Sequence, residues 1–125
     1  QESPFFGILA DVISQLGSFD VGLPQAPPID DFSDKKRASV KLSAQGLSMI
    51  DFRAEDNIFD TGASPSKMPT VYREVGVRSK GLLDAQDTKK LPEIEAELVS
   101  RFKKFEEGGT VRMPSPYKIV TAQKI

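Results

Sequence analysis

Residues 3 to 17, SPFFGILADVISQLG, form the clearest element of the chain and constrain its fold most. Ser3 is placed to cap a helix, and Pro4 suits the first helical position. Gly17 is placed to end the helix in the left-handed conformation. The apolar side chains recur at helical spacing: Phe5, Leu9, Val12, Ile13 and Leu16, with Phe6 and Ile8 beside them. They cover almost half of the helix circumference, so we expect a helix over residues 4 to 16 that packs on a large surface such as a sheet.

A second amphipathic segment covers residues 92 to 106 and is followed by Gly108-Gly109, which predicts another helix. Its apolar stripe consists of Leu91, Ile94, Leu98, Phe102 and Phe105. A shorter helix from Thr70 is also indicated. Residues 117 to 122 hold a β-branched run, Ile-Val-Thr, which predicts a strand.

The segment from Asp34 to Phe52 has two interpretations. One is a helix capped by Ser33 and closed by Gly46, followed by the strand LSMIDF. The other, equally compatible with the apolar pattern, is a hairpin over residues 36 to 52 that turns at Ala44-Gln45-Gly46. Residues 53 to 69 are rich in Asp, Gly, Ser and Pro and are expected to form a loop.

On the helix interpretation of residues 34 to 52, the order is helix, helix, strand, two or three helices, and strand, which predicts only two strands. Two strands do not make a stable sheet by themselves. The apolar stripes of the two predicted helices over residues 4 to 16 and 92 to 106 also have to be buried against another surface. We therefore expect a sheet of more than two strands, completed by another chain or segment in an assembly that buries well over ~2,000 Å².

The composition excludes several classes of function. The chain has 125 residues, room for one domain, and a net charge of −1, which gives no reason to expect nucleic acid or an anionic membrane as a partner. It has no Cys and no His, so thiolate nucleophiles, zinc clusters and Ser-His-Asp triads are absent. The densest acidic group, Asp30, Asp31 and Asp34, does not match the calcium-loop spacing, so no metal site is expected.

No apolar run approaches the ~20 residues that a membrane span needs. The first residue is Gln1, and no signal peptide precedes it. We expect a cytoplasmic chain that has been processed at its start or is a piece of a longer one.

Four stretches of the sequence resemble a known family. They are SPFFGILADVISQLG, Leu42 to Leu47 leading into SMIDF, a helical insert, and VRMPSPYKIVTAQK. Together they resemble the C-terminal half of a class I methyltransferase dependent on S-adenosyl-L-methionine (SAM), of the type 11 natural-product group. Where that family usually has Ala-Gly-Phe before the sixth strand, this chain has Gln45-Gly46-Leu47.

The resemblance implies an α/β fold: a partial Rossmann-like methyltransferase fold of helix, helix, strand, helical lid insert and strand. Residues 1–125 would be a single C-terminal segment, with 53–107 as the lid-like insert. None of the nine glycines forms a Gly-x-Gly-x-Gly turn that would hold the cofactor. SAM is therefore expected only through a partner or an N-terminal half, and this chain alone is expected to bind none.

The resemblance also implies which residues contact the acceptor, a hydrophobic small molecule. Phe5 and Phe6 would lie near it, and Met68 and Tyr72 would belong to the lid; ordinary core packing is the alternative for all four. No catalytic residue is assigned, because methyl transfer chiefly needs in-line placement and exclusion of water.

Three functions follow from these expectations. The first is the acceptor-side half of a methyltransferase, active only with a SAM-binding half. The second is a non-methylating pseudo-enzyme or cyclase subunit in a hetero-oligomer or an intertwined oligomer. The third, an unrelated small α+β binding domain, would follow from the hairpin over residues 36 to 52.

Overall fold

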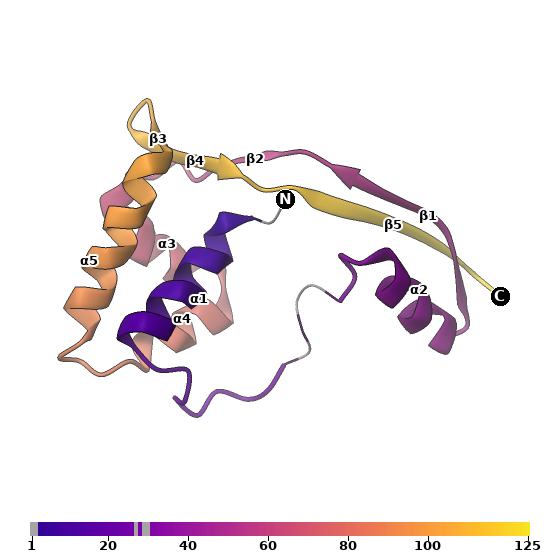
Figure 1. Ribbon diagram of the computed structural model, residues 1–125, viewed down its shortest axis with the longest axis horizontal. Coiled ribbons are helices and arrows are strands. Elements are labelled where there is room, and N and C mark those ends of the chain that lie inside the picture. Colours follow the sequence, from indigo (N-terminus) through magenta and orange to yellow (C-terminus); the bar gives the residue numbers. More distant parts are fainter. Residues whose placement is uncertain (1–2, 27, 29–30) are drawn as a thin grey trace. The chain divides into compact units, whose positions relative to one another are not determined.

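The computed structural model describes residues 3–26, 28 and 31–125 (Figure 1). The chain forms two compact units, each with its own packing. The helical unit consists of the chain up to Pro24 and of Ile58–Ser115. The strand-pair unit consists of Gln25–Asn57 and Pro116–Ile125.

The helical unit contains four α-helices: α1 (Pro4–Leu16), α3 (Met68–Val75), α4 (Val77–Asp84) and α5 (Leu91–Phe102). Single 3₁₀ turns precede α3 (η1, Pro65–Lys67) and follow α5 (η2, Lys103–Phe105). Three short strands complete the unit: β2 (Ile58–Asp60), β3 (Glu106–Glu107) and β4 (Thr110–Pro114). They form an antiparallel sheet in the order β2-β4-β3. The predicted helices over 4–16 and 92–106 are confirmed, the second ending four residues early as an α-helix. The short strand β2 lies where a loop was expected.

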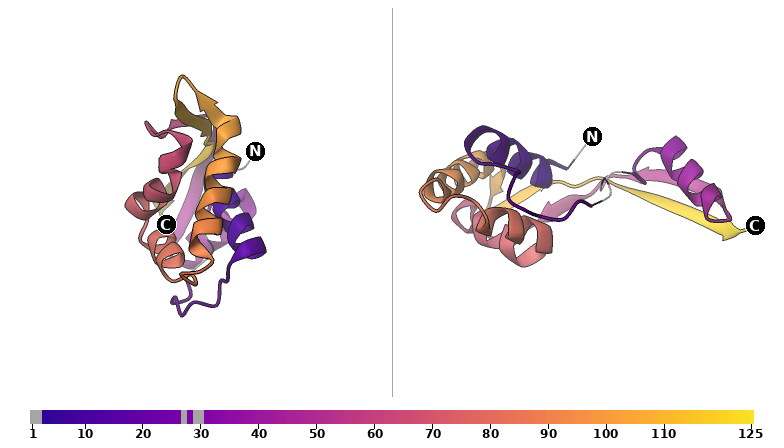
Figure 2. Two further views of the ribbon diagram at one scale, coloured as in Figure 1. Left: turned by 90° about the vertical axis from the view of Figure 1, so that its left-hand side faces the viewer. Right: turned by 90° about the horizontal axis from the view of Figure 1, so that it is seen from below.

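The core of the helical unit lies between its helices. Helices α1 and α5 run side by side in both views (Figures 1 and 2). The buried residues of the core are Phe5, Leu9, Val12, Ile13, Met68, Tyr72, Leu83, Ile94, Leu98, Phe102, Val111 and Met113. The expectation that the two apolar stripes need a larger sheet is therefore wrong for this unit, because the stripes cover each other and α3, α4 and β4 cover the rest.

The ends of α1 differ in part from the sequence prediction. Pro4 is the first helical residue, as expected, but the side chain of Ser3 makes no capping hydrogen bond. Gly17 has φ −125°, so the predicted left-handed end is wrong. A Cβ at Gly17 would lie 2.3 Å from Oε1 of Gln86. Glycine is needed here for a close approach rather than for a turn.

The strand-pair unit contains α2 (Lys35–Ala44), β1 (Leu47–Glu55) and β5 (Tyr117–Lys124). The hairpin interpretation is wrong, because α2 occupies its first half. Asp34 rather than Ser33 caps the helix, through a 2.8 Å hydrogen bond from the Arg37 backbone N–H to its carboxylate. Gly46, at φ +74°, makes the turn into β1 as expected.

β1 and β5 form an antiparallel two-stranded sheet, with Phe52 opposite Val120 and an irregularity between Met49 and Asp51. The predicted strand over 117–122 is confirmed. Its place in a sheet of more than two strands is wrong for the described residues, since β1 is its only partner there. The fold is thus a mixture of helices and small antiparallel sheets. No helix of the described chain is long and apolar enough to cross a membrane.

Candidate functional site

The four residues predicted to contact an acceptor lie on two helices of the helical unit. Phe5 and Phe6 are in the first turn of α1, and Met68 and Tyr72 are in the first two turns of α3. Phe5, Met68 and Tyr72 are buried in the core, whereas Phe6 is 49% exposed. The structure therefore brings three of the four together beneath the surface and leaves Phe6 accessible to a ligand.

An aromatic cluster surrounds the start of α1. The rings of Phe5 and Tyr72 stack with centroids 4.4 Å apart. Phe6 meets Phe5 edge to face at 4.9 Å, and Phe59 of β2 does so at 5.7 Å. The full cluster consists of Phe5, Phe6, Phe59, Tyr72, Phe102 and Phe105. Sequence reasoning missed Phe59, because β2 is too short to show a strand pattern.

Tyr72 is held in place by its hydroxyl. The phenol donates a hydrogen bond to the backbone carbonyl of Phe5. Burial raises the pKa of Tyr72 far above its ordinary value, since a buried phenolate would lose its hydration. Tyr72 therefore stays protonated and neutral, and it joins α3 to α1 rather than serving as a base.

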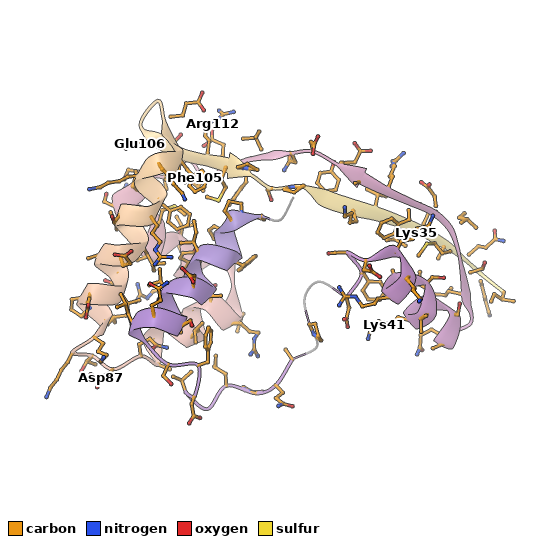
Figure 3. All side chains as sticks on the ribbon, in the orientation of Figure 1. Lys35, Lys41, Asp87, Phe105, Glu106 and Arg112 are labelled. Carbon is orange, nitrogen blue, oxygen red and sulfur yellow. The ribbon has the colours of Figure 1, made fainter. Side chains whose placement is uncertain are left out.

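The accessible part of this site is aromatic. Phe6 is exposed, and Phe59 and Phe105 are half-buried around the cluster. Figure 3 shows Phe105 at the C-terminal end of α5, next to β4. Aromatic faces and edges bind planar apolar molecules by stacking and edge-to-face contact. Phe6 offers an accessible ring of this kind, and none of the six rings carries a group that titrates near neutral pH.

Ion pairs fix the helices that carry the site. Arg101 of α5 bonds Asp11 of α1, and its Nη2 donates to Oε1 of Gln15 at 2.9 Å. Arg73 of α3 bonds Asp84 of α4 and Glu95 of α5, each at 2.8 Å. Arg101 thus makes an interhelical contact that no spacing in the sequence reveals, since Asp11 lies 90 residues away.

The described residues do not fit SAM. Five glycines have positive φ: Gly22, Gly46, Gly62, Gly108 and Gly109. Only Gly62 among them follows a strand and precedes a helix. That turn is closed by its own hydrogen bonds, from the Gly62 N–H to the Asp60 carboxylate at 2.9 Å and from the Thr61 hydroxyl to the Val111 carbonyl at 2.9 Å. The turn has no unpaired array of N–H groups to receive the cofactor's carboxylate.

The acidic group near α2 has a structural role. Asp30 lies outside the described residues. Asp34 caps α2, and Asp31 accepts from Lys41 at 2.9 Å. Within the described part of the chain, no group of three or more acidic residues is arranged to hold a metal ion.

Comparison with protein-family models, with characterised proteins and with solved structures gave no match. The function of the aromatic site therefore has to be argued from its geometry and from the sequence.

Proposed function

We propose that this chain is the acceptor-side portion of a SAM-dependent methyltransferase-like protein that acts on a hydrophobic small molecule together with a SAM-binding half. The incomplete sheet of the strand-pair unit carries the proposal. β1 and β5 span 9 and 8 residues, and each has a single partner among the described strands. A two-stranded ribbon is marginally stable in water unless a third strand or a helix packs on it. α2 packs on β1 but contributes a single buried residue, Ala38, so further strands would stabilise the pair.

The burial of side chains in the same unit supports this reading. Of its described hydrophobic residues, Ala38 alone is buried, whereas Val40, Ile50 and Tyr117 are 64%, 58% and 47% exposed. Doubly wound folds often carry an antiparallel edge strand on an otherwise parallel sheet. A SAM-binding half would supply the parallel strands and the glycine-rich turn, and β1 and β5 would form one margin of the completed Rossmann-like sheet.

The aromatic cluster supplies the acceptor surface in this proposal. Phe6 contacts the acceptor, and Phe5, Met68 and Tyr72 hold the surface behind it. Methyl transfer draws its acceleration from in-line placement of the acceptor and from exclusion of water, and an apolar aromatic surface contributes to both. We also propose a cytoplasmic location, which cell fractionation would test.

The decisive experiment recovers the affinity-tagged chain from the organism that encodes it and identifies by mass spectrometry what accompanies it. We expect a glycine-rich strand-turn-helix, either in a second chain or in the same longer chain. The assembly should bind SAM in calorimetry and transfer a labelled methyl group. The isolated 125-residue chain should do neither.

Phe6→Ala tests the acceptor surface. It should weaken acceptor binding by the assembly and leave SAM affinity unchanged. Phe19→Ala is the matched control, because Phe19 is 55% exposed and lies outside the aromatic cluster. Tight SAM binding by the isolated chain would contradict the proposal. SAM binding by the assembly without any methyl transfer would instead favour the pseudo-enzyme or cyclase subunit.

A further inference from the structure

Helix α2 begins with three consecutive cations, Lys35, Lys36 and Arg37, and contains no acidic residue. The N-terminal end of a helix carries partial positive charge, so cations in its first turn are unfavourable. Positions that break a local rule of this kind are often functional. Ser39 follows two residues after Arg37 and precedes Val40.

The structure separates the cations of α2 into two groups. The Asp31 carboxylate lies 2.9 Å from Nζ of Lys41 and 3.8 Å from Nη1 of Arg37. These two cations, four residues apart, form the first group on one side of the helix. No ion pair involves Lys35 or Lys36 within the part of the chain that the structure describes. Figure 3 shows Lys35 and Lys41 on different sides of α2.

Helical geometry sets Ser39 beside the second group, Lys35 and Lys36. Ser39 lies three residues after Lys36 and four after Lys35, and residues at these spacings are neighbours on a helix surface. The Ser39 hydroxyl is therefore flanked by two cations that lack an acidic partner among the described residues. A dianion on that hydroxyl would complement both charges.

We propose that Ser39 is a phosphorylation site for a protein kinase whose peptide-binding groove is acidic. The Ser39 hydroxyl oxygen would attack the γ-phosphorus of ATP, forming the new O–P bond as the bond to the β–γ bridging oxygen breaks. ADP leaves, and the hydroxyl proton passes to the kinase's catalytic base. Kinases distinguish substrates by such charge patterns. Lys36 and Arg37, three and two residues before the acceptor, meet the acidic subsites, and Val40, which is 64% exposed, meets an apolar one.

The serine becomes accessible through opening of α2. Ser39 is half-buried in α2. Because a protein kinase binds the residues around its acceptor serine in an extended form, α2 has to unwind locally before Ser39 can react. Ala38 is the one buried residue of α2. The ion pairs that Arg37 and Lys41 make with Asp31 involve cations that are about half exposed. Exposed ion pairs contribute little stability, and segments with few buried contacts open locally. After transfer, the phosphate lies within one turn of Lys35 and Lys36 and stabilises the re-formed helix.

The test incubates the full chain with the catalytic subunit of cyclic-AMP-dependent protein kinase and Mg-ATP, and maps phosphate by tandem mass spectrometry. We expect one phosphate, on Ser39. Ser39→Ala should abolish it. Ser43→Ala is the matched control on the same helix and should leave it intact. Arg37→Gln should lower the initial rate by about tenfold, the effect of losing one charge-assisted hydrogen bond.

A second measurement tests the two flanking lysines. Phosphorylation should slow amide hydrogen exchange in α2 by about twofold or more. Lys35→Gln leaves the residues at the two acidic subsites intact, so it should be phosphorylated normally but lose that protection. No phosphate on the folded chain, or phosphate on another serine, would overturn the proposal. Equal exchange in the phosphorylated wild type and the phosphorylated Lys35→Gln chain would overturn the role of the lysines.

Discussion

Replacing Gln86 by Leu should destabilise the helical unit by about 3 kcal/mol, since three hydrogen bonds worth about 1 kcal/mol each are lost. Gln86 is 5% exposed and closes the C-terminal end of α4 against the chain that leaves α1. Its Nε2 donates to the carbonyls of Ser18 and Leu82 at 2.8 Å, and its Oε1 accepts from the Ser18 N–H at 2.8 Å. Leucine fills a similar volume but leaves both backbone groups of Ser18 without this partner.

Urea unfolding followed by circular dichroism measures this loss. Gln45→Leu is the control, because Gln45 is exposed and no side-chain hydrogen bond involves it in the described structure, so its effect should stay within about 0.5 kcal/mol. Gly17→Ala adds a double-mutant cycle, because its Cβ would lie 2.3 Å from Oε1 of Gln86. The two substitutions should be strongly non-additive. A loss below about 1 kcal/mol for Gln86→Leu, or simple additivity, would refute this account of the α1–α4 contact.

Three further predictions concern the core and the titratable groups of the helical unit. Leu98→Ala removes a fully buried side chain and should cost about 2–5 kcal/mol in urea unfolding, whereas the exposed Val40→Ala should cost little; equal effects would refute the assigned core. Burial raises the pKa of Tyr72 above its ordinary value of 10.0, so the folded state holds this proton more tightly than the unfolded chain. The free energy of unfolding should fall as the pH rises above 10.0, less so in Tyr72→Phe, and parallel pH curves would contradict the burial of this phenol. Lys80 and Arg73 lower the pKa of Asp84 below its ordinary value of 3.8. Their ion pairs with Asp84 therefore stabilise the folded state at pH values above 3.8, and this stabilisation is lost as the pH falls through the pKa of Asp84 in the folded state. In Asp84→Asn the free energy of unfolding should therefore fall less steeply than in the wild type as the pH falls below 3.8. An equal fall in both proteins would show that these ion pairs contribute nothing to stability.

Local patterns predicted α1 and α5 because each of these two helices carries its own periodic signal. The stripe from Phe5 to Leu16 and the stripe from Ile94 to Phe105 each gave the right element within a few residues. The choice at residues 36 to 52 could not be made from spacing, because Ala38 and Leu42 fit both a strand face and a helix face. The Asp34 cap and the positive φ of Gly46 decide it in the structure.

Long-range partners were not predictable in the same way. A stripe shows that a face is buried but does not identify what covers it, so the sequence could not show that α1 and α5 cover each other. Gln86, Arg101 and Phe59 hold or line the site through contacts far along the chain. For the candidate site, the resemblance implied that Phe5, Phe6, Met68 and Tyr72 contact an acceptor, with core packing as the alternative. It did not show that Phe6 is the accessible member of the set.

The proposed need for a partner therefore has a different physical origin from the one the sequence indicated. Uncovered apolar stripes would have made the whole chain dependent on another sheet, yet the helical unit buries its stripes internally. What remains incomplete is the strand-pair unit, where backbone N–H and C=O groups along the outer edges of β1 and β5 lack strand partners among the described residues. Unpaired edges of this length are templates for further strands, and natural proteins pair or cover them. A partner that completes this chain is thus expected to act through backbone hydrogen bonds to a sheet edge, while the aromatic site keeps its own geometry.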